Sequence, residues 1–180
     1  PEFQRDLEAR YLGEIEHEII EKYFSMLNTW DSEQHKKISQ QVFVECLKKN
    51  NIQLSPHLWS KHFQEVVVYS KTGIEFLLQL IKVLPEAKFK FEQEYLDQNF
   101  KGRVDLIVES KIGNGILDFK RSAASVPSNK EHTSFEKIQM WSYLAHAQTN
   151  HDFLFWGYLR LKEIKNSLLY SMWDGFHVID

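Results

Sequence analysis

The sequence predicts an α/β fold in which a helical lobe precedes a mixed β-sheet flanked by helices. Two observations support this class. Apolar residues recur at helical spacing through the first half of the chain, up to about residue 83. After Pro85 the pattern changes to an alternation of apolar and polar residues, which is typical of strands. We therefore expect one domain, with a helical lobe at residues 4–84 and an α/β core at residues 86–180.

Three helices are expected in the lobe. The first covers residues 6–27, with Asp6 as its candidate N-cap, and its apolar positions recur every four residues. The second covers residues 33–49, with Ser32 as its candidate cap, and the third covers residues 56–83. The apolar positions of the first helix are Leu7, Tyr11, Ile15, Ile19, Tyr23 and Leu27.

The first three strands of the core are expected at residues 88–97, 102–109 and 115–120. The first two show the alternation of a half-buried strand, the third is a short and more apolar run, and the three look antiparallel to one another. The dipeptide Asn114-Gly115 is typical of a turn and predicts the end of a hairpin there.

One helix and two further strands complete the expected core. The helix runs over about residues 134–148, and Thr133 and Glu136 have the spacing of a capping box at its start. Residues 152–161 and 168–173 are expected to be strands. Helices, three strands, a helix and more strands are the element order of an α/β sandwich around a mixed sheet.

The composition excludes several classes of protein. The net charge of −3 does not indicate a strongly basic surface, so contact with nucleic acid would depend on a local basic patch. Cys46 is the only cysteine, which excludes an intrachain disulfide and a four-cysteine metal site. No apolar run approaches the roughly 18 residues of a membrane span, and a cytoplasmic location is expected. The opening Pro1-Glu2-Phe3 is typical of a cloning scar, which predicts an excised domain.

The chemistry of the chain is expected at Asp105 and at the run Asp118-Phe119-Lys120. Side chains alternate between the faces of a strand, so those of Asp118 and Lys120 point the same way. Asp105 lies on the preceding strand, which a hairpin at residues 110–114 joins to the next. Pairing of the two strands can therefore place the carboxylates of Asp105 and Asp118 side by side.

Two neighbouring carboxylates repel each other unless a cation lies between them. Oxygen ligands with open positions suit Mg²⁺ or Mn²⁺, and such an ion lowers the pKa of a bound water and offsets charge on a phosphate. A lysine on the same face can orient the water or stabilise the transition state. The alternative interpretation of an Asp-x-Lys run is a solvated strand face. The apolar Ile116-Leu117 before Asp118 and the Gly102–Asp105 run on the preceding strand favour the metal site.

Four motifs, in this order along the chain, resemble those of the PD-(D/E)XK nuclease superfamily. The resemblance is greatest to the C-terminal nuclease domains of RecB- and AddB-type helicase–nucleases, and it covers nearly the whole chain. It implies a restriction-endonuclease-like fold and a Mg²⁺- or Mn²⁺-dependent deoxyribonuclease that hydrolyses phosphodiester bonds. The motifs are Gly13-x-x-x-His17, Gly102-x-x-Asp105, Asp118-x-Lys120 and Gln139-x-x-x-Tyr143.

The resemblance also implies roles for single residues. Lys120 is expected to be the catalytic lysine, and Gln139 and Tyr143 to support the site or to contact DNA. Glu92 matches a further carboxylate of the family, or is a solvent-facing strand residue. Gly13 is expected to leave room for a neighbouring segment beside the histidine. The implied metal ligands are three side chains and one backbone carbonyl, those of His17, Asp105, Asp118 and Phe119.

The expected substrate is single-stranded DNA or DNA ends. Five basic residues cluster in sequence around the motifs and could form a local phosphate-binding patch, or they are separate solvated charges. Arg103 and Arg121 are the ones we assign to DNA, because Arg121 adjoins Lys120 and Arg103 lies two residues before Asp105. The five are Lys101, Arg103, Lys111, Arg121 and Lys130.

The family implies a role in repair or recombination, as the exonuclease domain of a longer protein or as the partner of a helicase. No phosphate-binding motif of a helicase occurs in the chain, and no cysteine set for an iron–sulfur cluster is present. Two rival interpretations stay open. One is a DNA-binding or scaffold module that kept the fold without activity, and the other is a metal-dependent phosphodiesterase for RNA or small nucleotides.

Overall fold

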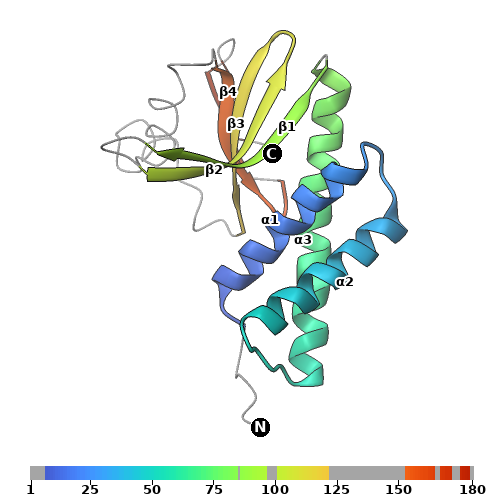
Figure 1. Cartoon of the computed structure of the whole chain (residues 1–180). Coiled ribbons are helices and arrows are strands. Elements are labelled where there is room, and N and C mark those ends of the chain that lie inside the picture. Colours follow the sequence, from blue (N-terminus) through green and yellow to red (C-terminus); the bar gives the residue numbers. More distant parts are fainter. Residues whose placement is uncertain are drawn as a thin grey trace. The chain divides into compact units, whose positions relative to one another are not determined.

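The computed structural model describes residues 7–84, 86–96, 101–121, 153–164, 167–171 and 175–178. Within these residues three helices come first and six strands follow, coloured from blue to red in Figure 1. The chain divides into two compact units, Pro1–Leu78 and Gln79–Asp180, which we describe separately. A helical lobe followed by a mixed sheet confirms the predicted α/β class.

Helices α1 (Ala9–Met26), α2 (Ser32–Lys49) and α3 (Pro56–Val83) match the three predicted helices closely. Each helix buries one apolar stripe, as the spacing in the sequence predicts. In α1 this stripe includes Ile15 and Ile19, which are almost completely buried. Burial of such side chains supplies most of the stability of helices of this length.

The two N-terminal caps that the sequence predicted are wrong. The N-cap of α1 is Glu8 rather than Asp6, and its side chain makes no capping hydrogen bond. The N-cap of α2 is Asp31 rather than Ser32, and its carboxylate accepts hydrogen bonds from the backbone N–H of Glu33 at 2.9 Å and of Gln34 at 3.0 Å. Aspartate and serine are both favourable caps, so adjacent residues of the two types left the helix start ambiguous by one position.

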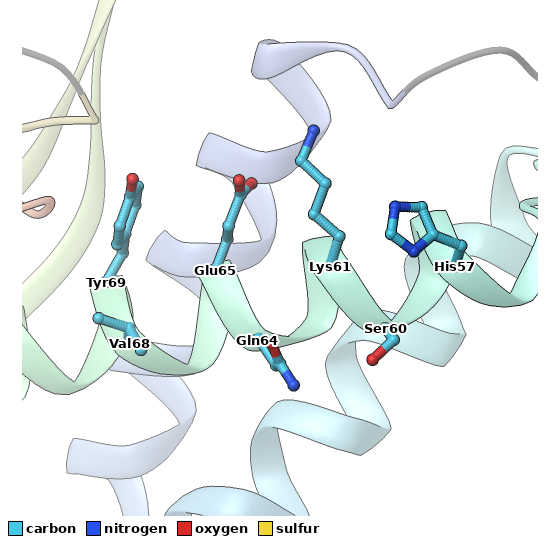
Figure 2. A pocket seen from close by; sticks show the side chains of 7 residues that line it. All are labelled: His57, Ser60, Lys61, Gln64, Glu65, Val68 and Tyr69. Carbon is cyan, nitrogen blue, oxygen red and sulfur yellow. The ribbon is translucent and has the colours of Figure 1, made fainter.

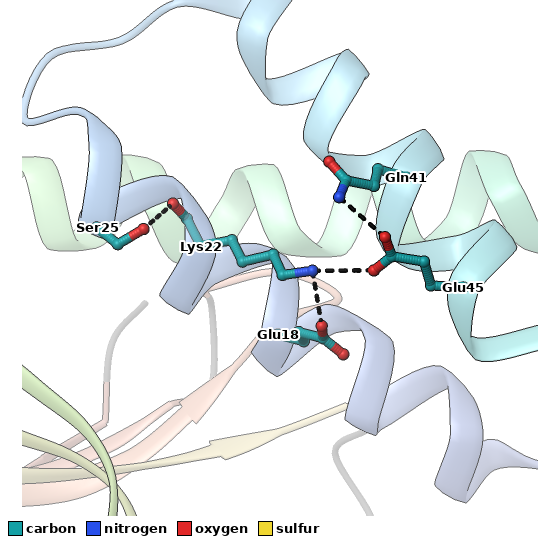
Figure 3. Close-up of polar contacts among 5 residues, drawn as sticks. All are labelled: Glu18, Lys22, Ser25, Gln41 and Glu45. Carbon is teal, nitrogen blue, oxygen red and sulfur yellow. Dashed lines mark hydrogen bonds and ion pairs between the residues drawn. The ribbon is translucent and has the colours of Figure 1, made fainter. Parts of the chain in front are cut away.

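Polar contacts join the exposed sides of α1 and α2, as Figure 3 shows. The Lys22 ammonium lies 3.0 Å from carboxylate oxygens of both Glu18 and Glu45, and Gln41 donates a hydrogen bond to Glu45 at 2.9 Å. Exposed pairs of this kind contribute about 0.2–1 kcal/mol each. They adjust the pairing of two helices whose apolar sides already hold them together.

A buried histidine links α2 to α3 inside the helical unit. Nε2 of His35 lies 2.9 Å from Oγ of Ser70, and that hydroxyl donates its own hydrogen to the carbonyl of Val66 at 2.6 Å. The hydroxyl therefore accepts from His35, which places the proton of the neutral ring on Nε2. Burial lowers the pKa of His35 from 6.5 to about 4, and the nearby Lys71 ammonium adds to the shift.

The second unit contains a six-stranded sheet in which the strands follow one another in chain order. All neighbouring strands are antiparallel except β3 and β4, which run parallel, so the sheet is mixed as predicted. The strands are β1 (Lys88–Leu96), β2 (Lys101–Ser110), β3 (Gly113–Lys120), β4 (Phe153–Arg160), β5 (Leu168–Ser171) and β6 (Gly175–Val178).

Five of these strands were predicted, and β6 was not. Its four residues are too few to show an alternation, and we had expected residues 168–173 to form the last strand. The predicted helix at residues 134–148, with its capping box of Thr133 and Glu136, lies outside the described residues.

The turn between β2 and β3 differs from the prediction. Asn114 and Gly115 both lie within β3, and the turn consists of residues 111–112, because Ser110 pairs with Gly113. Gly113 has φ 139°, a conformation open to glycine that lets the chain reverse tightly. The structural role of Gly115 is different: a methyl group there would overlap the ring of Phe155 on β4.

Candidate functional site

Four neighbouring strands bring four polar side chains onto one rung of the sheet. Residues opposite each other in neighbouring strands have their side chains on the same face. The register pairs Asp118 of β3 with Tyr158 of β4. The antiparallel register of β2 and β3 pairs Leu106 with Leu117. The next residues along the two strands, Asp105 and Asp118, therefore lie opposite each other. The β1–β2 register likewise sets Glu92 opposite Asp105. We call Glu92, Asp105, Asp118 and Tyr158 the polar rung.

Asp105 ties β2 to β3 through its side chain. Its Oδ2 accepts a hydrogen bond from the backbone N–H of Phe119 at 2.7 Å. This bond fixes the orientation of the carboxylate, and each carboxylate oxygen has more than one lone pair with which to accept further ligands. Asp105 is half-buried, while Asp118 and Phe119 on β3 are buried. The structure therefore brings the predicted Asp105 and Asp118 to adjacent strands and the same face.

Lys120 forms an ion pair with Asp118 at the end of β3. Its Nζ lies 2.6 Å from Oδ2 of Asp118, and the side chains are 20% and 2% exposed. Their spacing of two residues puts them on one face, as the sequence predicted. A carboxylate this deeply buried needs a cation or hydrogen bonds, because burial penalises its charge.

Glu92 belongs to the same group of charges, although the sequence left its position open. A carboxylate oxygen of Glu92 lies within 4.8 Å of one of Asp105. Glu92 also forms an ion pair with Arg103, whose Nε lies 2.5 Å away. The backbone of Glu92 has φ 51°, the left-handed region that a non-glycine residue enters at a cost of about 1–2 kcal/mol.

The donors of the rung fit a hard divalent cation. Two unit charges as close as those of Glu92 and Asp105 repel by about 3 kcal/mol at an effective dielectric constant of about 20. Arg103 and Lys120 offset two of the three carboxylates, which leaves a net formal charge of −1 over these five side chains. Oxygen ligands with excess negative charge are what Mg²⁺ and similar ions bind.

His17 belongs to the helical unit and lies half-buried on α1, beside the buried Glu16. Gly13 was expected to leave room for a neighbouring segment, and this stays a prediction. A methyl group built at Gly13 meets no atom within 4 Å among the described parts of the chain. The described residues of the chain therefore include no segment that approaches this glycine closely.

The residues that we expected to contact DNA differ in their exposure, their partners and their place in the sheet. Arg103 is 57% exposed and pairs with Glu92, and Arg121 is half-buried directly after β3. Lys111 lies in the turn at the far end of the β2–β3 hairpin and pairs with Glu86 at 3.1 Å. That turn is six residues, or about 20 Å, along the strand from Asp105. Lys101 begins β2, whereas Lys130, Gln139 and Tyr143 lie outside the described residues.

Tyr158 and Arg160 are residues of this face that the sequence interpretation missed. The register pairs Lys120 with Arg160, and Arg160 Nη2 lies 3.3 Å from Glu163 Oε1. Both side chains are buried on β4, which was predicted only as an apolar strand. Their spacing of two residues, with apolar neighbours between them, was the one signal available. It could not show which strand they would join.

A hollow also runs along part of α3. Figure 2 shows that its side chains all come from this helix, with His57, Lys61, Glu65 and Tyr69 in a row four residues apart. Such a row is the ordinary result of helical geometry. None of these residues belongs to the polar rung. Among the described residues, no helix has the length and apolar composition to cross a bilayer.

A family model described as the PD-(D/E)XK nuclease superfamily matches residues 1–167 of the chain. This span includes strands β1 to β4 and therefore every side chain of the polar rung. No curated protein matches the chain significantly.

Proposed function

The chain belongs to the PD-(D/E)XK nuclease superfamily, and on that basis we propose that it is a metal-dependent deoxyribonuclease that hydrolyses phosphodiester bonds. The observation that carries this proposal is the geometry at the end of β3. Asp105 and Asp118 lie on adjacent strands and on one face, and Lys120 is held against Asp118 at 2.6 Å.

The proposed metal ion is Mg²⁺ or Mn²⁺, held by carboxylates of the rung. Its ligands in this proposal are Asp105 and Asp118, with Glu92 as a third carboxylate from β1. A divalent ion bound there supplies an activated water and offsets negative charge on the phosphate. The close approach of Glu92 and Asp105, within 4.8 Å, supports Glu92 as a ligand. The family motifs add the imidazole of His17 and the backbone carbonyl of Phe119.

The chain's own residues have distinct tasks in this proposal. Asp105 is oriented by the N–H of Phe119, so its carboxylate needs no reorganisation when a ligand arrives. The Lys120 ammonium has three donors on a compact charge, which suits it to orient the attacking water or to stabilise charge on the phosphate. Asp118 keeps that ammonium at the carboxylates, because the pair is largely shielded from solvent.

DNA is the proposed substrate, as single strands or ends, with exonuclease action. Arg103 and Arg121 are the proposed phosphate contacts of the described residues, and Gln139 and Tyr143 are proposed to support the site or to contact DNA. The motifs also suggest work beside a helicase in repair or recombination. Phosphate contacts of this kind position a strand without reading its sequence.

The proposal is tested by incubating the protein with labelled linear and circular DNA, single- and double-stranded, with Mg²⁺, with Mn²⁺ or with a chelator. We expect cleavage with metal only, and linear substrates alone if the action is exonucleolytic. Asp118→Asn and Lys120→Gln should each reduce kcat by at least about 10²-fold, since each removes a group acting on the transition state. Only Asp118→Asn should also weaken Mn²⁺ binding.

Glu109→Gln is the matched control. Glu109 is a carboxylate on the same face of β2, but it pairs with Lys90 toward the hairpin turn. Glu109→Gln should therefore leave both the cleavage rate and the Mn²⁺ affinity unchanged. An Asp118→Asn protein that cuts DNA at the parent rate contradicts the proposal. A protein that binds Mn²⁺ through Asp105 and Asp118 but cuts only RNA or small nucleotides would be the rival phosphodiesterase. One that binds DNA without Mn²⁺ affinity or cleavage would be the inactive module.

A further inference from the structure

Tyr158 lies beside the Asp118–Lys120 pair, on the neighbouring strand. The parallel register sets it opposite Asp118, so both side chains are on the same face of the sheet. Its side chain is 2% exposed, and its ring is therefore fixed by the surrounding core. Nothing in the nuclease motifs includes this residue.

The ring of Tyr158 faces the ammonium group of Lys120. Nζ of Lys120 lies 5.7 Å from the ring centroid and 2.6 Å from Oδ2 of Asp118. A cation within about 6 Å of an aromatic face is attracted by the negative charge of that face. Lysine has a long flexible side chain, so one carboxylate contact alone leaves its ammonium several positions. A ring held in place on the neighbouring strand reduces the number of positions that the ammonium group can occupy.

Arg160 strengthens this interpretation. It is opposite Lys120 in the β3–β4 register, and like charges that are directly opposite repel each other. The two cations have separate partners: Arg160 lies 3.3 Å from Glu163, while Lys120 contacts Asp118 and the Tyr158 ring. Contact with Asp118 and the Tyr158 ring therefore holds Lys120 at the carboxylates, while Glu163 offsets the charge of Arg160.

We propose that Tyr158 is a positioning residue for Lys120, and that its buried ring holds the ammonium group against Asp118 in the geometry that cleavage needs. The effect on catalysis rests on the proposed function, since that is where Lys120 acquires its role. The contact between ring and ammonium is a property of the sheet, and it can be measured without any substrate.

The contact is tested by NMR on protein with ¹³C-labelled lysine, in which the Lys120 signal is assigned by its loss in Lys120→Arg. The ring current of Tyr158 should move the Lys120 Cε protons upfield. The shift should persist in Tyr158→Phe and disappear in Tyr158→Leu. Identical Lys120 signals in the parent and Tyr158→Leu proteins would overturn the proposal.

The effect on catalysis is tested with aromatic rings of similar shape whose faces differ in partial charge. Pentafluorophenylalanine introduced at position 158 keeps the ring but removes its negative face, so the fold survives even if Tyr158→Leu does not fold. We expect kcat to fall about tenfold relative to Tyr158→Phe, with KM and Mn²⁺ affinity unchanged. The same residue at Phe155, on the opposite face of β4 against Gly115, is the control and should leave kcat unchanged.

The results separate the two proposals. If the parent protein cuts no DNA under any condition, the proposed function fails and the NMR signal alone decides whether Tyr158 holds Lys120. If the parent cuts DNA but pentafluorophenylalanine at position 158 leaves kcat at the Tyr158→Phe value, the positioning role is wrong while the nuclease assignment stands.

Discussion

Solvent exposure decides how much each charged side chain in and around the polar rung contributes to stability. The Asp118 side chain is 2% exposed and that of Arg103 is 57% exposed. A buried pair that loses one partner costs several kcal/mol, whereas an exposed pair is worth about 0.2–1 kcal/mol. We therefore expect replacement of Lys120 to disturb its surroundings, and replacement of Arg103 to leave the fold intact.

Arg103→Gln should change metal and DNA binding in opposite directions. The arginine pairs with Glu92, so its removal leaves that carboxylate available to a divalent ion, and Mn²⁺ affinity should rise up to about fivefold. If Arg103 also contacts a phosphate, DNA affinity should fall, and the slope of log K against log salt should decrease by about 1. Calorimetry with Mn²⁺ and a salt titration of DNA binding measure both effects.

Lys90→Gln is the control for this experiment. Lys90 forms the other cross-strand ion pair of β1 and β2, with Glu109 at 2.6 Å, away from the rung. Lys90→Gln should change neither the Mn²⁺ affinity nor the DNA affinity. A Mn²⁺ affinity that falls in Arg103→Gln would mean that the arginine supports the metal site instead of competing for its ligand.

For single residues, the sequence predicted which charged side chains share a face of a strand better than it predicted backbone conformation. That Asp118 and Lys120 share a face followed directly from their spacing of two residues on one strand. The place of Glu92 stayed open, because its left-handed backbone, with φ 51°, has no signal in the residue type. The packing role expected for Gly13 has no counterpart among the described residues.

At the scale of the strands, Gly115 controls how closely β3 and β4 approach. Gly115→Ala should destabilise the fold by about 1–3 kcal/mol, because the added methyl group overlaps the ring of Phe155 on the neighbouring strand. Urea unfolding measures the change. Phe155→Leu in the same protein should recover part of the loss, because it makes room for the methyl group.

Gly13→Ala is the matched control for that substitution. Gly13 lies within α1, and a methyl group there meets no described atom within 4 Å. Alanine in an exposed helix stabilises by about 0.5–1 kcal/mol relative to glycine. Equal destabilisation by both substitutions would show that the loss at Gly115 is not due to contact with the Phe155 ring.

Secondary structure was largely predictable because burial imposes a period on the sequence. The helices α1 to α3 follow an apolar spacing of about 3.6 residues and the strands β1 and β2 one of 2, while β3 is a short, almost continuously buried run. The errors are at the ends of helices and strands, where neighbouring residues are almost equally suitable as a cap or a turn. Asp31 and Ser32 compete as caps, and Asn114-Gly115 has the composition of a turn although the chain turns at residues 111–112.

For the molecule as a whole, the buried His35 makes stability depend on pH. Its folded pKa of about 4 lies below the ordinary 6.5, so the unfolded chain binds the proton more readily between these values. The contribution of the neutral ring is therefore complete above pH 6.5 and is lost as the pH falls toward 4. We expect a loss of up to about 3 kcal/mol over this range.

Urea unfolding followed by circular dichroism at pH 7, 5.5 and 4.5 measures this dependence. Carboxylates titrate in the same range, so the informative quantity is the difference between the parent protein and His35→Gln, whose amide can still donate to Ser70. That difference should shrink as the pH falls. A difference independent of pH would contradict a buried neutral histidine.

The assembly of the site was the part that the sequence could not supply. Strands β1 to β3 are consecutive hairpin neighbours, so the proximity of Asp105 to Asp118 could be anticipated. The parallel pairing of β4 with β3 joins residues about forty positions apart, which only the folded sheet reveals. Tyr158 and Arg160 therefore had no visible connection to Lys120 before the register was known.

The unusual backbone of Glu92 has a consequence for how this protein can change over time. Glycine and asparagine adopt a positive φ more readily than glutamate, so either would relieve the local strain and make the sheet more resistant to heat. Each would also remove an acidic group from the rung. If Glu92 is a metal ligand, as proposed above, thermal stability and cleavage rate make opposite demands on position 92, and glutamate there favours cleavage at the expense of stability.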